Sequence, residues 1–76
     1  MTSQDYDHQK LARLREDKGL TVSAVAEKLE ISRQTVYFAE RGGVISFDLL
    51  KRFARLYGVP IVSLLQEAHK TADSLT

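Results

Sequence analysis

Apolar side chains recur every three or four residues along most of the chain, which is the spacing of one buried face of an α-helix. Four stretches before residue 58 have this spacing, and each is followed by a glycine or by a short polar link. They are "HQKLARLREDK" at 8–18, "VSAVAEKL" at 22–29, the stretch 33–41 and "FDLLKRFARLY" at 47–57. No segment alternates apolar and polar residues as a strand would. The pattern therefore predicts a series of short helices.

Residues that start and stop helices stand at the borders of these stretches. Thr21, Ser32 and Ser46 directly precede the second, third and fourth stretch, where a hydroxyl caps the first turn of a helix. Glycines follow the ends of the first, third and fourth stretches, and Pro60 suits the first turn of a fifth helix. We therefore predict an all-α fold, a compact five-helix bundle. Its domain would span residues 9–67, between a flexible N-terminal tail (1–8) and a C-terminal helix extension or tail (68–76).

Composition narrows the classes of function. A chain of 76 residues has room for one domain with one small core. It has no cysteine, so it can form neither a disulfide nor a thiolate metal site. The longest nearly apolar run, "VPIVSLL", is far too short to cross a membrane, and the N-terminus lacks the apolar segment of a signal peptide. We therefore expect a cytoplasmic protein with no membrane partner. The net charge of +1 neither favours nor excludes nucleic acid.

The link between the second and third predicted helices is the most specific feature of the chain. Only Glu30 and Ile31 separate the apolar stripe that ends at Leu29 from the cap at Ser32. So short a link makes the two helices cross steeply, and the small side chain of Ala26 lets them approach closely. This is a helix-turn-helix arrangement, in which the second helix projects from the body of the domain.

The outward face of the third predicted helix differs from an ordinary solvated surface. At about 100° per residue, Val36 and Ala39 fall on its inward side. The outward side carries Arg33, Gln34, Tyr37, Phe38 and Arg41. A helix face in water is usually filled with Lys, Glu and Gln, so two neighbouring aromatic side chains indicate a binding surface.

A family resemblance rests on "LREDKGLTVSAVAEKLEISRQTVYFAERGG" together with "FDLLKRFARLYGVPIVSLL". The chain resembles the phage Cro/repressor-type (XRE) helix-turn-helix family over about residues 11–65. The matching elements are Arg15, "GLT", Ala26, Leu29, "IS", Val36, "ERG" at 40–42, Leu50, "GV" at 58–59 and "LL" at 64–65. The resemblance implies a lambda repressor-like fold and a DNA-binding transcription regulator, usually dimeric, whose partner is double-stranded DNA.

The resemblance also implies roles for residues around the third helix, which would lie in the major groove. Contacts to bases would come from Arg33, Gln34, Tyr37 and Phe38, since Arg pairs well with guanine and Gln with adenine. Contacts to phosphates would come from Thr21, Ser32, Thr35, Arg41 and Gly43. Arg15 and Glu40 match positions that form a structural ion pair between the first and third helices.

Three positions depart from the family pattern. Val22 stands where relatives usually carry Gln, and Gly43 stands where a Lys or Arg is frequent, so two side chains that would bind the DNA backbone are missing. The position of Phe38 is usually polar. An aromatic there could pack on a thymine methyl group. The alternative is that Tyr37 and Phe38 pack against the N-terminal tail or the fourth helix.

The C-terminal part carries a candidate dimer interface. Ile61, Leu65, Ala68, Ala72 and Leu75 are spaced 4, 3, 4 and 3 residues apart, as along the seam of a helix pair. A fifth helix with this seam predicts a homodimer. The alternative is a fifth helix that ends near Glu67, followed by a frayed "TADSLT".

Nothing in the sequence suggests catalysis, a metal, a cofactor or a small-molecule ligand. The two histidines, His8 and His69, lie near opposite ends, and Asp5, Asp7 and His8 lie in a tail with little to fix their geometry. The main hypothesis is a homodimeric repressor that reads a pseudo-palindromic operator. The alternative is a helical protein–protein interaction module, antitoxin-like or anti-repressor-like, that uses Tyr37 and Phe38 on a protein partner.

Overall fold

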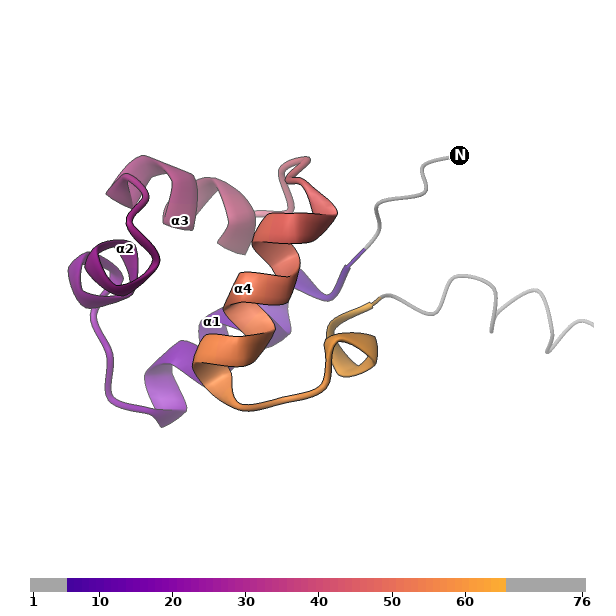
Figure 1. Cartoon of the computed structure of the whole chain (residues 1–76). Helices are drawn as coiled ribbons and strands as arrows, with labels where there is room; N and C mark the ends of the chain where they lie inside the picture. Colours follow the sequence, from indigo (N-terminus) through magenta and orange to yellow (C-terminus); the bar gives the residue numbers. More distant parts are fainter. Residues whose placement is uncertain (1–5, 66–76) are drawn as a thin grey trace, which may run out of the picture.

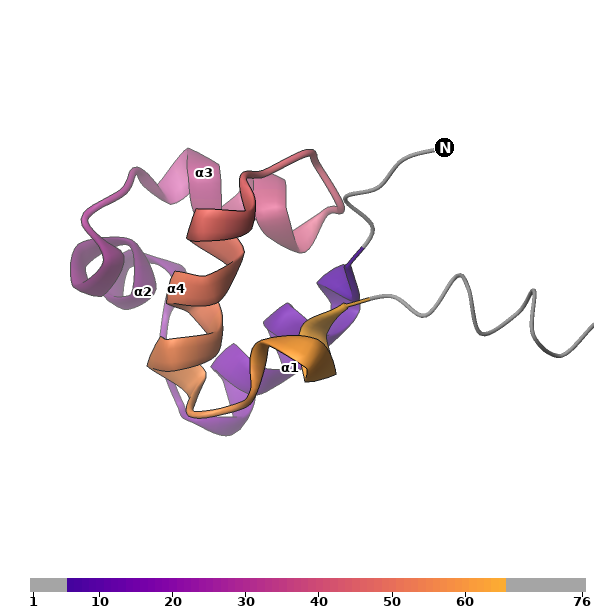
Figure 2. The same cartoon turned by 45° about the vertical axis from the view of Figure 1, so that its right-hand side comes forward.

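The computed structural model describes residues 6–65 and forms a bundle of four α-helices with one short turn of 3-10 helix. The elements are α1 (His8–Asp17), α2 (Val22–Leu29), α3 (Arg33–Glu40), α4 (Phe47–Tyr57) and η1 (Ile61–Leu64). α2 and α3 lie together at one side, α4 crosses the middle, and α1 and η1 lie at the other side (Figures 1 and 2). Within the described range there is no strand, and no helix is long and apolar enough to span a membrane. The all-α prediction is confirmed.

Each α-helix begins at a side chain that caps its first turn. Thr21, Ser32 and Ser46 accept hydrogen bonds from the backbone N–H three residues ahead at 3.0, 3.1 and 3.0 Å, as predicted. Asp7 does the same for α1, with 3.1 Å to the N–H of Lys10. These bonds satisfy N–H groups that have no partner inside the helix.

The core lies where all five elements meet. Each contributes a side chain that is completely buried: Leu11, Val25, Val36, Phe53 and Leu64. Tyr57 on α4 extends this core, with its ring centroid 6.1 Å from that of Phe53. A core shared by every element makes the domain fold as one unit.

The five-helix count is not confirmed: within the described residues, the segment expected to form the fifth helix is the single turn η1, after which Leu65 is extended (φ −82°, ψ 138°). In a continuing α-helix the carbonyl of Leu64 would accept from the N–H of residue 68. It accepts instead from the N–H of Asp7 at 2.7 Å, and Leu65 pairs with Tyr6 in an isolated antiparallel bridge. The step from Ile61 to Leu65 therefore does not follow one α-helix. Ala68, Ala72 and Leu75 lie outside the described residues.

The N-terminal segment is part of the packed domain from Tyr6 onward. Tyr6, Asp7 and His8 belong to the stretch 1–8 that was predicted to be a tail, and residues 1–5 lie outside the described part. Tyr6 is 6% exposed and belongs to the core. The extended Tyr6–Leu65 pairing joins the two ends of the described chain.

A partly buried ion pair joins α1 to the end of α3. Arg15 Nε donates to Glu40 Oε2 at 2.8 Å, and the Arg15 Nη2 donates to Oε1 at 3.3 Å. The two side chains are 16% and 10% exposed. Arg15 Nη1 also donates to the carbonyl of Leu20 at 3.1 Å, and the bond to Glu40 raises the pKa of Arg15 above its usual value. The guanidinium of Arg15 is therefore held in its charged form by three hydrogen bonds.

The hydroxyl of Tyr57 lies near this ion pair and is buried without a hydrogen-bond partner among the described residues. Burial raises the pKa of Tyr57 to about 12, and the charge of Glu40 acts in the same direction. The folded protein therefore holds Tyr57 in its neutral form.

Replacing one partner of the ion pair should be costly. Glu40→Ala leaves the charge of Arg15 largely buried and without its carboxylate, which we expect to lower the free energy of unfolding by about 3–5 kcal/mol. Urea unfolding measures this loss. The control is the double variant Arg15→Met/Glu40→Met, which replaces both charges with apolar groups and should be more stable than Glu40→Ala. The single variants Arg15→Met and Glu40→Met complete the cycle. If the double variant loses as much free energy of unfolding as the two single variants together, the two side chains are not coupled.

Tyr57→Phe should make the protein less sensitive to high pH. The unfolded chain ionises this group near pH 10 and the folded protein near pH 12. The stability that depends on the neutral hydroxyl is therefore complete below about pH 10 and falls as the pH rises toward 12, by about 2–3 kcal/mol in all. Urea unfolding of both proteins between about pH 8 and pH 11 tests this. Parallel curves for the two proteins would show that Tyr57 contributes nothing to the alkaline loss.

Candidate nucleic-acid interface

The turn between α2 and α3 holds the projecting helix firmly. Glu30 adopts the left-handed conformation (φ 59°, ψ 46°), which costs a non-glycine residue about 1–2 kcal/mol. The N–H of Ile31 donates back to the carbonyl of Ala26 at 2.9 Å, and Arg52 of α4 donates to the carbonyl of Leu29. Ala26 is buried, as a close approach of the two helices requires. The end of α2 is thus tied to α4, and α3 starts from a fixed point.

The outward face of α3 is the one that the helical spacing predicts. Val36 and Ala39 are completely buried, whereas Tyr37 is 51% and Phe38 44% exposed. Arg33, Gln34 and Arg41 are also exposed, and none of the three side chains bonds to another residue of the described range. One surface of α3 therefore presents two guanidinium groups, an amide and two half-exposed rings to the solvent.

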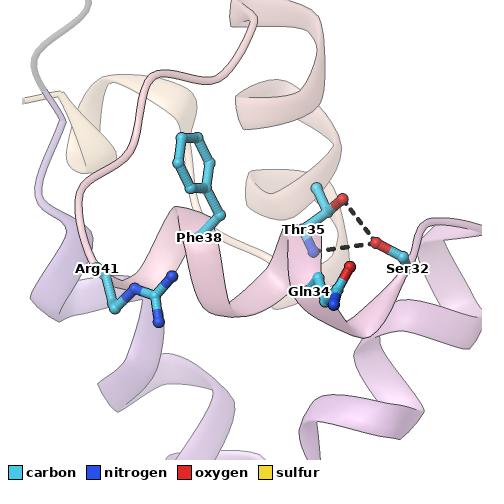
Figure 3. Close-up of a pocket in the computed structure, with 5 residues that line it drawn as sticks. All are labelled: Ser32, Gln34, Thr35, Phe38 and Arg41. Atoms are coloured by element: carbon cyan, nitrogen blue, oxygen red, sulfur yellow. Dashed lines mark hydrogen bonds between the residues drawn. The ribbon is translucent and has the colours of Figure 1, made fainter.

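A shallow hollow of about 380 Å³ runs along this face. It is lined by Ser32, Gln34, Thr35, Phe38 and Arg41 (Figure 3). The hydroxyls of Ser32 and Thr35 lie 2.9 Å apart at one end, and Ser32 Oγ also accepts from the N–H of Thr35 at 3.1 Å. Because one hydroxyl donates to the other, the second proton of this pair is free for an outside acceptor.

Phe38 lies against the connection between α3 and α4. Its side chain points from α3 toward the connection to α4 (Figure 3), and its ring covers Gly43 in that connection. The N–H of Gly43 donates to the carbonyl of Phe38 at 2.9 Å, and the N–H of Gly42 donates to that of Ala39 at 3.1 Å. These two bonds form a Schellman motif that ends α3. The Gly43 N–H is thus already engaged, and a phosphate contact from it would require this bond to break.

Two N-terminal residues hold the same end of α3, and neither was predicted from the sequence. The Tyr6 hydroxyl lies 2.8 Å from the carbonyl oxygen of Ala39 and 2.6 Å from that of Gly43, and it donates its one proton to this pair. Burial raises the pKa of Tyr6, which keeps that proton in place. His8 Nδ1 lies 3.0 Å from the carbonyl oxygen of Glu40, so this nitrogen carries the proton and donates it.

A signal for Tyr6 is present in the sequence. An apolar residue directly before a helix cap often packs on the residue five positions later, in a hydrophobic staple. Tyr6 precedes the cap Asp7, and Leu11 stands five positions on; both belong to the core. Nothing local shows the far partners of the hydroxyl, since Ala39 and Gly43 lie 33 and 37 residues away.

Comparison with known proteins gives the family. A family model described as helix-turn-helix, of the XRE type, matches residues 11–64. The chain belongs to the XRE-type helix-turn-helix family. Searches of curated proteins and of solved structures gave no match.

Membership in the XRE family makes the chain a DNA-binding regulator of that type. The matched region runs from the buried Leu11 of α1 to the buried Leu64 of η1, so it includes the whole core apart from Tyr6. The family is a regulatory one and is not typically enzymatic. Within residues 6–65, no group of three or more His, Asp or Glu side chains is placed to hold a metal ion.

Proposed function

We propose that the protein is a homodimeric, sequence-specific repressor that reads a pseudo-palindromic operator through α3 in the major groove. The observation that supports this most is the composition of the exposed face of α3. The side chains of Arg33, Gln34 and Arg41 make no hydrogen bond within the described domain and the rings of Tyr37 and Phe38 are half-exposed, whereas Val36 and Ala39 on the other face are completely buried. A helix that presents such groups from a fixed turn suits the reading of base edges.

Base contacts are proposed for Arg33, Gln34, Tyr37 and Phe38. Arg33 and Gln34 lie in the first turn of α3, which enters the groove deepest in this docking geometry. A guanidinium donates two hydrogen bonds to guanine, and a carboxamide pairs with adenine through one donor and one acceptor. Tyr37 offers a hydroxyl, and the ring of Phe38 offers an apolar surface for a thymine methyl group.

Phosphate contacts are proposed for Thr21, Ser32, Thr35 and Arg41, around the edge of the same face. Thr21 Oγ1 accepts from the N–H of Ala24 at 3.0 Å, which leaves its own proton for a phosphate oxygen. Ser32 and Thr35 have one spare hydroxyl proton between them. Arg41 follows α3 directly and is exposed. Such contacts fix the register of the protein on the duplex and carry no sequence information.

The homodimer is proposed from the helical spacing of Ala68, Ala72 and Leu75, the part of the predicted seam that lies beyond the described residues. Ile61 and Leu65 are partly buried against the core, and the neighbouring Val62 is 63% exposed. An apolar surface next to the last described residues is consistent with a second copy there. Two-fold symmetry would place the centres of the two half-sites about 10–10.5 base pairs apart, or a multiple of that.

The exposure of Tyr37 and Phe38 also suits a second function, binding of a protein partner through α3. Salt distinguishes the two functions. The affinity for DNA falls linearly on a log–log scale as salt rises, because phosphate contacts release counterions. An aromatic contact with a protein responds far less.

Gln34→Ala and Arg41→Ala should affect DNA binding in different ways. Gln34→Ala should cost about 1–3 kcal/mol per half-site and relax the preference at one base position. Arg41→Ala should weaken binding to all sequences alike and lower the salt slope by about 1 for each phosphate that is no longer neutralised. Selection from random DNA followed by salt titration of the affinity measures both effects. Identical changes in the two variants would contradict the division into base and phosphate contacts.

Ala72→Asp should convert the dimer to a monomer, because it places a charge in the proposed apolar seam outside the described domain. Sedimentation would show half the mass, and binding to a two-half-site operator would weaken while thermal unfolding of the monomer stays the same. Thr71→Asp is the matched control, since it adds the same charge one position off the seam. A variant Ala72→Asp that keeps the dimer mass would reject this seam.

A further inference from the structure

Gly43 is a glycine whose backbone does not require one. The chain has four glycines, and Gly19, Gly42 and Gly58 have positive φ angles that favour this residue, whereas Gly43 does not. Its dihedral angles therefore allow a side chain. What excludes a side chain is the ring of Phe38. A Cβ added to Gly43 would lie 2.3 Å from Phe38 Cε2, 2.4 Å from Cζ and 2.5 Å from Cδ2, closer than real Cβ contacts.

The backbone of Gly43 is held from both sides and cannot make room. Its N–H donates to the carbonyl of Phe38 at 2.9 Å, and its own carbonyl accepts from the buried Tyr6 hydroxyl at 2.6 Å. The residue before it is held as well, because the N–H of Gly42 donates to the carbonyl of Ala39 at 3.1 Å. A side chain at position 43 would therefore displace the ring and not the backbone.

The ring of Phe38 has few alternative conformations. On an α-helix, a Phe side chain favours two χ1 rotamers, near about 180° and −60°, since the third clashes with the preceding turn. A Cβ at position 43 would therefore force the ring to turn about χ1 or χ2, and a change to the other favoured χ1 rotamer would carry it away from Gly43. The ring is 44% exposed and forms one wall of the hollow shared with Gln34 and Arg41. Moving it reshapes the surface that faces the DNA.

We propose that Gly43 is a specificity-determining position that acts through Phe38. Because Gly43 has no side chain, the ring can occupy the place where it meets a base. Tyr6 supports this as a positioning residue, because its hydroxyl holds the Gly43 carbonyl. This inference rests on the proposed function of α3 as the base-reading helix. Gly43 itself contacts no base.

The test is a double-mutant cycle in which the measured quantity is the preference of the protein for each base of the operator. Gly43→Ala is introduced into the full chain and into Phe38→Ala, and the relative affinities for operators with each base at each position are measured. In the full chain, Gly43→Ala should change the preference at one position per half-site, by about fourfold, the worth of one buried methyl group. In the Phe38→Ala background it should change nothing further. Val44→Ala is the neighbouring control, since Val44 is 74% exposed.

A second variant addresses the positioning role of Tyr6. Tyr6→Phe keeps the buried ring but removes the proton donated to Ala39 and Gly43. It should broaden the preference at the same base position as Gly43→Ala and leave the position read by Gln34 unchanged. A role in stability alone would weaken binding to all operators in proportion and leave the preferences as they were.

The outcomes separate this inference from the proposed function. If Gln34→Ala relaxes one base position while Gly43→Ala leaves the whole profile unchanged, only the role of Gly43 is overturned. The same holds if Gly43→Ala acts equally with and without the Phe38 ring, or if it fails to fold, which would mean that the ring does not yield. If the unmodified protein shows no base preference, both proposals are overturned.

Discussion

The ion pair between Arg15 and Glu40 sets the rotation of α3 about its own axis, and the choice of side chains on its exposed face depends on that rotation. Successive side chains on an α-helix are about 100° apart, so holding one residue toward α1 fixes where all the others point. With Glu40 drawn to α1 and Val36 and Ala39 buried, Gln34, Tyr37, Phe38 and Arg41 must face outward. Because breaking one buried charge from its partner costs several kcal/mol, this orientation is strongly preferred. A turn of α3 by one residue would expose apolar side chains and separate the pair.

The four α-helices could be predicted from the sequence because each combines three local signals. A polar cap stands between two apolar residues five positions apart, and the pairs are Tyr6 and Leu11, Leu20 and Val25, Ile31 and Val36, and Ile45 and Leu50. Periodic apolar residues follow each cap, and a left-handed glycine follows three of the four ends. The exception is the end of α2, where Glu30 takes the left-handed conformation. The short link, the neighbouring helices and the bond from Arg52 hold it there, and none of these is visible in residue preferences.

The end of the helical pattern at η1 and the role of the Tyr6 hydroxyl could not be predicted, and both failures have one cause. The apolar spacing after Pro60 is helical, yet the carbonyl of Leu64 bonds to Asp7, 57 residues earlier in the chain. The same N-terminal segment sends the Tyr6 hydroxyl to the end of α3. Periodicity reports only the faces of single helices, whereas these contacts join residues that no local pattern relates. For the same reason the exposed face of α3 was predictable, but the placement of its Phe38 ring was not.

Two departures from the family pattern, an aromatic side chain at position 38 and glycine at position 43, are in physical contact here. In a comparison with the family pattern, the two departures look unrelated. Position 38 lacks the polar side chain that is usual there, and position 43 lacks the Lys or Arg that is frequent there. In the structure the ring of Phe38 occupies the space that any side chain at position 43 would need. An aromatic residue in this rotamer therefore requires glycine at position 43, and a Lys or Arg there requires the ring to be absent or turned away. The two residues form one unit: the space that a side chain at position 43 would take is filled by an apolar ring, which lies beside Gln34 and Arg41 in the hollow on α3.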